Sequence, residues 1–301
     1  MSITAHKLNK WLKMLKGDSV YHVNQTEGLC YSKDRLEGYY NNLTDKVLRF
    51  GDEPGKVPIS KMDNGMEVFF SIAIFQYGLA SYDLLLMGHD ADDMRLNLKA
   101  CADWALDNQL DNGAWKTFDF ENGAAPYSSM AQGEGASLLL RAHKELGDAR
   151  YFDAARRAIE FMLLPVAQGG TALYERDDVY LYEYTDKPLV LNGWIFSLWG
   201  LFDYVKVTGD KELDALYKRA LHSLKASLPL FDMKYWSKYD SKDIIASPFY
   251  HSLHIAQLNT LYDLTGLEEF RQYAKKWCGY SENPRYAKKA FINKTIQKIL
   301  E

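Results

Sequence analysis

Carboxyl, phenol and imidazole side chains are concentrated around three long segments, residues 112–128, 168–191 and 233–249. A carboxylate removes a proton and a phenol, with an ordinary pKa of about 10, donates one, so these groups suit general acid–base catalysis. The chain also holds 21 Tyr, 14 Phe and 7 Trp. Flat rings in such numbers suit either a thick core or a groove that stacks sugars, and composition alone does not choose between them. The candidate residues are Tyr127, Gln132, Glu134, Glu183, Tyr184, Asn192, Tyr239, Tyr250, His251 and His254.

Some of these residues have structural interpretations as well. His251 and His254 lie three residues apart near an expected helix start, a spacing that suits either metal ligation or helix capping. No third ligand is evident beside them, so we expect no metal. Gln132 and Glu134 alternate with glycines at another helix start, where they either satisfy free backbone N–H groups or contact a sugar. The three cysteines lie far apart without a CxxC motif, and we expect buried thiols.

A repeated pattern must position these segments: an apolar helix, a short turn at a glycine, and an amphipathic helix. It occurs at 84–108, 138–164, 198–228 and 258–280, around Gly88, Gly147, Gly209 and Gly266. These glycines are 59, 62 and 57 residues apart, which is close to one period. Such a period indicates stacked helix pairs, and the repeat unit is therefore an αα-hairpin.

The two helices of a hairpin differ in what they bury. The first is apolar nearly all round, as at 68–87 and 194–205, so it must be covered on most sides; the second is striped, as at 213–228. Alternating inner and outer helices predict an all-α fold, an incomplete α/α toroid built from αα-hairpin repeats. Short β segments are expected at 172–174 and 179–184. Each long segment leads into an inner helix, so all three should line a cleft at one face.

Composition and charge narrow the class of protein further. The 301 residues have a net charge of -4 and no long block of one sign, which argues against nucleic-acid binding. Residues 1–16 read as an amphipathic helix without a signal-peptide pattern, so we expect a cytoplasmic protein. The longest apolar run, 68–87, is interrupted by polar residues and suits a buried helix, not a membrane span. We expect one domain over 1–301, with residues 1–60 as a helical extension and the repeats at about 65–280.

Six short motifs carry a resemblance to a known family. They are FQYGL at 75–79, YSSMAQGE at 127–134, YEY at 182–184, LNG at 191–193, YD at 239–240 and YHSLH at 250–254. In this order and at this spacing, the sequence resembles the C-terminal catalytic domain of the D-glucuronyl C5-epimerases. These enzymes convert glucuronate to iduronate within heparosan-type polysaccharides. The family resemblance implies an α/α toroid, which agrees with the repeat pattern.

The resemblance also implies site residues. It puts Glu183, Tyr184, Tyr239 and Tyr250 on the catalytic positions, with Glu183 and Tyr184 at one face of the sugar, Tyr250 at the other and Tyr239 assisting. The family often shows Tyr-Asp-Leu-Arg where this chain has Lys242 as the last residue, and lysine lacks the planar fork of arginine. The candidates for holding the sugar carboxylate are Lys242, His251, His254 and Asn192, and the candidates for other sugar contacts are Tyr127, Gln132 and Glu134.

The sequence thus predicts an isomerase, a uronate C5-epimerase that acts on a uronic-acid-containing polysaccharide or oligosaccharide without a cofactor. A homodimer is a further expectation. Two rival functions stay open. A glycoside hydrolase needs a pair of carboxylates, which Glu134 with Glu183, or Glu183 with Asp240, would supply. A glycan-binding protein would keep the toroid without the chemistry.

Overall fold

The computed structural model describes residues 23, 25–49, 51, 53–62, 65–121 and 123–300. The amphipathic helix expected at 1–16 lies outside the described residues. The chain divides into two compact units. The larger unit consists of Gly28–Leu189 and Gly193–Leu224, and the C-terminal unit consists of Val190–Asn192 and Lys225–Glu301 together with the N-terminal residues up to Glu27. The expected single domain over 1–301 stays a prediction.

Helices dominate both units, with two short antiparallel sheets in the larger one. In chain order the elements are α2 (Asp45–Leu48), β1 (Ser60–Lys61), β2 (Glu67–Val68), α3 (Ser71–Leu86), α4 (Ala91–Asn108), α5 (Ser129–Leu146), α6 (Ala149–Leu163), the 3-10 helix η1 (Val166–Gln168), β3 (Ala172–Glu175), β4 (Asp178–Leu181), α7 (Leu191–Thr208), α8 (Lys211–Ser227), η2 (Leu228–Phe231), α9 (Pro248–Thr265), α10 (Glu268–Glu282) and α11 (Pro284–Leu300). The apolar run at 68–87 becomes the buried helix α3, and no helix among the described residues is long and apolar enough to cross a bilayer.

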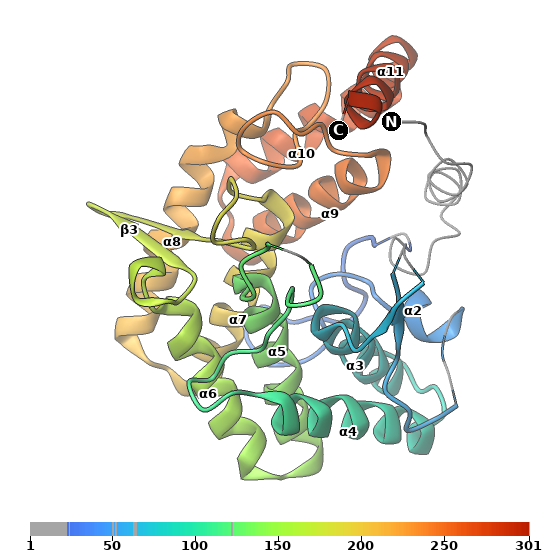
Figure 1. Cartoon of the computed structure of the whole chain (residues 1–301), viewed down its shortest axis with the longest axis vertical. Helices are drawn as coiled ribbons and strands as arrows, with labels where there is room; N and C mark the ends of the chain where they lie inside the picture. The colour runs from blue at the N-terminus through green and yellow to red at the C-terminus, as the bar shows by residue number, and fades with distance from the viewer. Residues whose placement is uncertain are drawn as a thin grey trace. The chain divides into compact units, whose positions relative to one another are not determined.

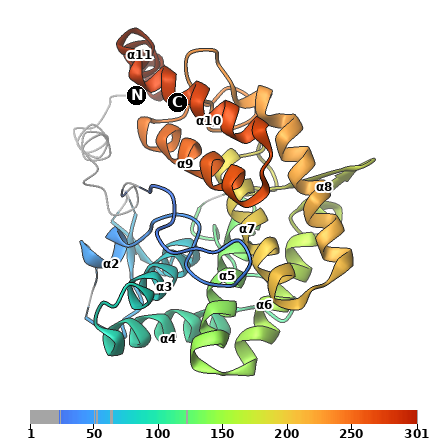
Figure 2. The same ribbon diagram turned by 180° about the vertical axis from the view of Figure 1, so that it is seen from behind.

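Packing between the two helices confirms three of the four predicted hairpins, and the fourth is present as the consecutive helices α7 and α8. Helix α3 packs on α4, and α5 packs on α6, in the larger unit (Figure 1), while α9 packs on α10 in the C-terminal unit (Figure 2). The turn glycines Gly88, Gly147, Gly209 and Gly266 all have positive φ, from 66° to 82°. Glycine adopts this left-handed conformation without a steric cost, so it can end one helix and turn the chain into the next.

Burial separates inner from outer helices as the sequence predicts. Every residue of α5 from Ser129 to Ala142 is buried, whereas α6 buries one stripe that includes Tyr151, Ala155 and Phe161. Helices α5 and α7 approach each other at two glycines: a Cβ added to Gly200 would lie 2.3 Å from the Cα of Gly133. Only glycine permits such a backbone contact, so these two residues set the distance between two inner helices.

The long segments lie where the repeat pattern places them, between α4 and α5, between α6 and α7, and between α8 and α9. In the second segment β3 and β4 form an antiparallel hairpin. The strand expected over 179–184 ends at Leu181 because the backbone of Tyr182 is held elsewhere. Its N–H donates to Thr171 O at 2.9 Å, and its carbonyl accepts from Ser129 N, at the start of α5, at 3.0 Å. Glu183 therefore follows directly after the residue that meets the first turn of α5.

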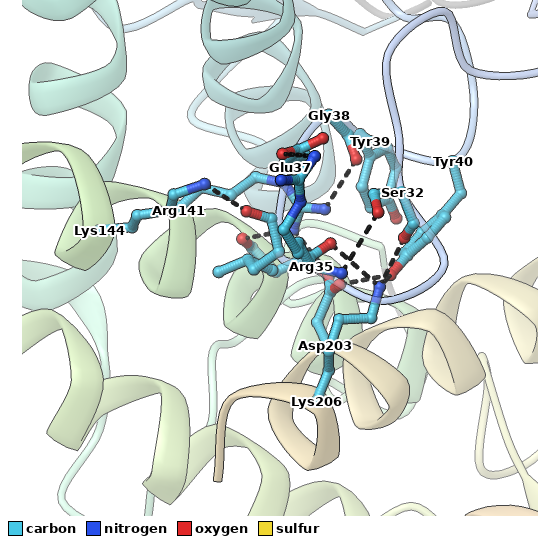
Figure 3. Close-up of polar contacts among 12 residues, drawn as sticks. Ser32, Arg35, Glu37, Gly38, Tyr39, Tyr40, Arg141, Lys144, Asp203 and Lys206 are labelled. Carbon is cyan, nitrogen blue, oxygen red and sulfur yellow. Dashed lines mark hydrogen bonds and ion pairs between the residues drawn. The ribbon is translucent and has the colours of Figure 1, made fainter. Parts of the chain in front are cut away.

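A buried ion pair holds residues 28–40 onto the inner helices of the larger unit (Figure 3). The Arg141 guanidinium of α5 donates to Asp203 of α7 at 2.6 Å and to the carbonyls of Glu37 and Gly38, and both charged side chains are fully buried. The phenol of Tyr40 donates to the same aspartate at 2.5 Å. Because every charge has several partners, the segment is fixed in place, and it carries Tyr39 into the interior beside α5.

Candidate functional site

Glu183 is a buried carboxyl with one oxygen left unpaired. Its residue is 5% exposed and Oε2 has no hydrogen-bond partner among the described residues. Burial raises its pKa to about 8; the nearby Lys187 opposes this shift and Glu121 adds to it. A carboxyl with a pKa near neutrality is suited to take up and release a proton at physiological pH.

The first turn of α7 determines where this carboxyl lies. A Cβ added to Gly193 would lie 2.3 Å from Glu183 Oε2 and 2.7 Å from Glu183 Cβ. Any other residue would therefore displace the glutamate, which explains a glycine in the LNG motif. The free N–H groups of a helix start also favour a negative charge nearby, so this position supports the ionised form of Glu183.

Glu134 is a second buried carboxyl in the same unit. It lies on α5 and is fully buried, and its Oε1 accepts from Gln76 Nε2 of α3 at 2.8 Å, while Oε2 has no partner among the described residues. Burial raises its pKa to about 8, the Gln76 hydrogen bond and Lys46 lower it, and Glu183 raises it. The negative charge of Glu183 thus helps to keep a proton on Glu134.

Tyr184 lies in a stack of aromatic and cationic side chains of the larger unit. Its ring packs against Phe118 with centroids 4.3 Å apart and planes 16° apart, and Lys187 Nζ lies 4.0 Å from the ring centroid. The ring is half-buried. The cation over the ring face is a cation–π contact, which helps to hold the ring of Tyr184 in this position.

Tyr239 and Tyr250 are brought together in the C-terminal unit. Their ring centroids are 4.8 Å apart at 62°, an edge-to-face contact. Both pack beside the small core around Trp236 and Ile245 and are half-buried. The Tyr239 carbonyl accepts from Leu191 N, which ties this segment to the start of α7. The two phenols are therefore neighbours within one unit, and their catalytic roles stay predictions.

The two histidines of α9 are buried and neutral. The backbone N–H of Ser237 donates to His251 Nδ1 at 3.1 Å, so Nε2 carries the proton and donates to Trp277 O. Burial lowers the pKa of His251 to about 4 and that of His254 well below its ordinary value. Neutral imidazoles supply no positive charge, so neither is suited to bind a carboxylate by charge; their role as carboxylate ligands stays a prediction.

Lys242 and Asp240 lie in the turn that leads to α9. Asp240 Oδ1 accepts from the backbone N–H groups of Lys242 and Ile244, each at 3.0 Å. This carboxylate therefore holds its own turn, as aspartates commonly do. The Lys242 side chain is exposed, and its expected contact with the sugar carboxylate stays a prediction.

The remaining expected sugar contacts have structural partners. Gln132 Nε2 donates to the carbonyls of Gly113 and Ala158, and its Oε1 accepts from Trp115 N. Tyr127 packs edge-to-face on Phe161 at 5.0 Å. Asn192 is buried in the C-terminal unit with its Oδ1 unpaired among the described residues. Gln132 thus fastens the first long segment to α5 and α6, whereas Asn192 retains a free acceptor.

The larger unit holds Tyr127, Gln132, Glu134, Glu183 and Tyr184, and the C-terminal unit holds the remaining candidates. Sequence reasoning missed Lys46 and Gln76, which lie beside Glu134. Gln76 stands in the FQYGL motif, and an amide inside an apolar helix is a feature that could have identified it as a candidate. The sequence around Lys46 contains no comparable feature. In the described part of the chain, no group of three His, Cys, Asp or Glu side chains is arranged to hold a metal ion.

The structure is that of an all-α protein of helical hairpins, with two buried carboxyls of raised pKa in its larger unit. The chain belongs to the D-glucuronyl C5-epimerase C-terminus family, which matches residues 108–279, more than half of the sequence. This family is one of carbohydrate epimerases. The resemblance seen in the motifs is thereby confirmed.

Two curated relatives are similar to the chain. The D-glucuronyl C5-epimerase of Caenorhabditis elegans is 29% identical over 216 residues, 62% of this chain and 35% of the relative. An uncharacterized protein of Methanocaldococcus jannaschii is 34% identical over 155 residues, half of each protein. The chain therefore matches between about a third and a half of the length of these relatives.

Solved structures support the fold. A UGL variant in complex with dGlcA-Glc-Rha-Glc matches with a TM-score of 0.51 at 15% identity, covering 91% of this chain and 82% of the other. At this identity the match shows the fold alone. It confirms the expected α/α-toroid class, which is built from helical hairpins.

Proposed function

We propose that the chain is a uronate C5-epimerase that converts D-glucuronate residues to L-iduronate in a heparosan-like polysaccharide or oligosaccharide. Membership of the epimerase family supports the reaction class, and the name of the Caenorhabditis elegans relative supports the sugar. The observation that carries the proposal is Glu183, a buried carboxyl with an unpaired oxygen and a pKa raised to about 8, beside Tyr184.

The reaction needs two proton transfers at one carbon. Glu183 takes the proton from C5, the C5–H bond breaks, and its electron pair moves into the sugar carboxylate, which gains a second negative charge. Tyr250 then donates its phenolic proton to the opposite face of C5 and becomes a phenolate. Water returns a proton to the phenolate and takes the one held by Glu183. No atom is oxidised or reduced overall, so the reaction balances without a cofactor.

Tyr184 and Tyr239 assist the two proton-transfer groups. Tyr184 adjoins the base in sequence, and Lys187 lies over its ring. Tyr239 contacts the ring of Tyr250, and in this mechanism it assists the proton transfer by Tyr250. Each phenol adds a hydrogen-bond donor, and such donors lower the barrier where charge develops.

Solvent exchange tests the proposal. The chain is incubated with heparosan in heavy water, and the H5 signal of glucuronate and the appearance of iduronate are followed by NMR. We expect deuterium at C5 without new reducing ends. Glu183→Gln should lower exchange by at least about 100-fold, because general acid–base catalysis contributes 10²–10⁴-fold. Exchange by Glu183→Gln at the wild-type rate would refute the role of this glutamate.

A matched pair of variants separates chemistry from folding. Tyr250→Phe removes only the phenolic oxygen, so turnover should fall while heparosan binding is kept. Glu160→Gln on the exposed side of α6 and Tyr273→Phe on α10 are the controls, and both should exchange normally. Loss of binding in Tyr250→Phe would instead make Tyr250 a binding residue.

A glycoside hydrolase is the second candidate, because Glu134 and Glu183 are two buried carboxyls of one unit and Glu183 raises the pKa of Glu134. Glycosidases use such pairs as acid and base or nucleophile. The alternative pair of Glu183 with Asp240 is less suited, because Asp240 holds the backbone of its turn. New reducing ends in the heparosan experiment would favour the hydrolase, and binding with neither product would favour a glycan-binding protein.

A further inference from the structure

Ser237 connects the third long segment, residues 233–249, to helix α9. Its backbone N–H donates to His251 Nδ1 at 3.1 Å, and its hydroxyl oxygen lies 2.7 Å from the same nitrogen and 3.1 Å from His254 Nδ1. All three residues are fully buried. Two imidazoles of one helix thus meet at a single serine, and this serine fastens the segment to the helix.

The hydrogen bonds of this group determine where its protons lie. Because His251 Nδ1 accepts from the Ser237 N–H, this nitrogen carries no proton, and the Ser237 hydroxyl must also donate to it. The hydroxyl oxygen then acts as an acceptor, so His254 Nδ1 carries a proton and donates to it. On the other side of His251, the Nε2–H donates to Trp277 O at 3.1 Å. The two histidines therefore have opposite tautomers.

His251 is held on its face as well as at its edges. The indole ring of Trp236 stacks on the imidazole with centroids 3.7 Å apart and planes 12° apart. Trp236 is itself fixed, because its Nε1–H donates to Ala246 O at 3.0 Å, and the Ala246 N–H donates to Ser237 O at 3.1 Å. Both ring nitrogens of His251 have partners within the protein, so neither remains to bind a sugar carboxylate.

The two tyrosines of the C-terminal unit adjoin this network in sequence. Tyr239 follows Ser237 by two positions, and Tyr250 directly precedes His251. Their rings meet edge to face, with centroids 4.8 Å apart at 62°. The bonds between Ser237 and His251 thus join the two backbone segments within two residues of each ring. A shift of the segment along α9 would separate the two phenols.

We infer that Ser237 and His251 are positioning residues, which hold Tyr239 edge-on to Tyr250. The inference rests on the proposed function for the role of Tyr250 as proton donor. In that reaction the phenol must lie at the correct distance from C5, and a misplacement of about 1 Å can cost about 100-fold in rate. Neither Ser237 nor His251 contacts the sugar in this scheme, because both act through the tyrosine pair.

The first test is spectroscopic and needs no turnover. Nitrogen-15 NMR of the histidine-labelled chain distinguishes the two tautomers of a neutral imidazole. We expect His251 to be protonated at Nε2 and His254 at Nδ1, with the signals assigned by single variants at each position. Carbon-13-labelled tyrosine should show a nuclear Overhauser contact between the rings of Tyr239 and Tyr250. The same tautomer for both histidines would overturn the inference, because the directed network would not exist.

Variants connect the network with catalysis. His251→Phe keeps a ring against Trp236 but makes no hydrogen bond, so the contact between the tyrosines should be lost. The kcat for C5 exchange should then fall by about 10- to 100-fold, with the KM for heparosan unchanged. His251→Asn, whose amide oxygen accepts a hydrogen bond in place of Nδ1, should recover most of kcat. Ser237→Ala removes only the hydroxyl and should lower kcat by about tenfold, and it provides the same test if His251→Phe does not fold.

Thr265→Val is the matched control, because it removes a hydroxyl at the opposite end of α9. That hydroxyl donates to Leu261 O at 2.6 Å and accepts from Leu267 N at 3.2 Å. The control should keep the tyrosine contact and the wild-type kcat. An intact tyrosine contact in both His251→Phe and Ser237→Ala would overturn the inference, whether or not kcat falls, because the two residues would then not hold the pair.

The outcome is separable from that of the proposed function. If the tyrosine contact depends on His251 while the wild type exchanges no C5 proton, the two positioning residues stand and the epimerase proposal fails. If exchange depends on Tyr250 but neither the contact nor kcat depends on Ser237 and His251, the epimerase proposal stands and the inference fails.

Discussion

At the scale of single residues, burial moves the pKa values of Glu134, Glu183 and Lys46 towards one another. Glu134 and Glu183 are acids made weaker by burial, and Lys46 is a base made weaker by burial. All three have pKa values near 8, although their ordinary values span about six units. Such convergence is typical of sites that transfer protons, because a proton then moves between groups at little cost.

The raised pKa of Glu183 predicts a pH profile. A base must be ionised to accept a proton, so below its pKa of about 8 the rate of exchange should rise about tenfold per pH unit. We expect kcat/KM for C5 exchange to climb from pH 6 and level off near pH 8. The measurement is NMR exchange at a series of pH values with Glu160→Gln as control. A flat profile between pH 6 and 8 would contradict the assignment of Glu183 as base.

His251 predicts a stability effect at acidic pH. Its pKa is lowered to about 4, so between about pH 6.5 and 4 the unfolded chain binds a proton that the folded chain does not. Stability therefore falls as pH drops through this window, by up to about 1.4 kcal/mol per unit. His251→Gln should be less stable at pH 7 but should lose less between pH 7 and 5 than the wild type, as measured by urea unfolding. An equal loss in both proteins would contradict the prediction.

At the scale of elements, glycines decide how close the inner helices and the site segments come. Gly133 and Gly200 bring α5 and α7 into backbone contact, and Gly193 lets Glu183 lie against the first turn of α7. The turn glycines of the hairpins have a different function, because their positive φ ends one helix and starts the next. A side chain at Gly133, Gly193 or Gly200 would displace atoms of the helix contact or of the site. A side chain at a turn glycine would only strain the turn.

Gly193→Ala tests this distinction. The added methyl group would lie 2.3 Å from Glu183 Oε2, so the carboxyl must move. We expect C5 exchange to fall by about 100-fold, the cost of a displacement near 1 Å at a reacting group. Gly147→Ala is the control: its φ is 75°, nothing lies within 4 Å of the added methyl group, and it should lose about 1 kcal/mol of stability with normal exchange. Normal exchange by Gly193→Ala would show that Glu183 does not need this placement.

At the scale of the whole chain, contacts distant in sequence hold the described N-terminal residues to the helices. The Arg141–Asp203 pair joins α5 to α7 and to residues 37–40, so one buried ion pair connects parts that lie more than 160 residues apart (Figure 3). The expected cytoplasmic location and homodimer stay predictions.

Arg141→Met should lower stability by about 3–5 kcal/mol, because it leaves Asp203 buried and unpaired. The double variant Arg141→Met/Asp203→Leu should recover part of this loss, since no charge remains uncompensated. Urea unfolding of both single variants and of the double variant measures the coupling. If the double variant loses the full sum of the two single losses, the pair is not coupled.

The sequence by itself determined the helical hairpins, their turn glycines, the three long segments and the family. These features depend on local patterns, such as apolar stripes and glycines at the ends of helices, which are present in the chain before it folds. The sequence was also sufficient to select Glu183, Tyr239 and Tyr250 as candidate site residues, because these residues stand in the motifs that resemble the family.

Only the tertiary structure decided the state of those residues. The end of β4 at Leu181, the neutral histidines, the turn held by Asp240 and the burial of Lys46 depend on which groups lie beside one another after folding. Burial changes the free energy of a charge through its surroundings, and a sequence pattern carries no record of those surroundings. Lys46 shows this most clearly: its sequence context reads as that of an ordinary exposed lysine, yet the residue is only 8% exposed and burial lowers its pKa to about 8.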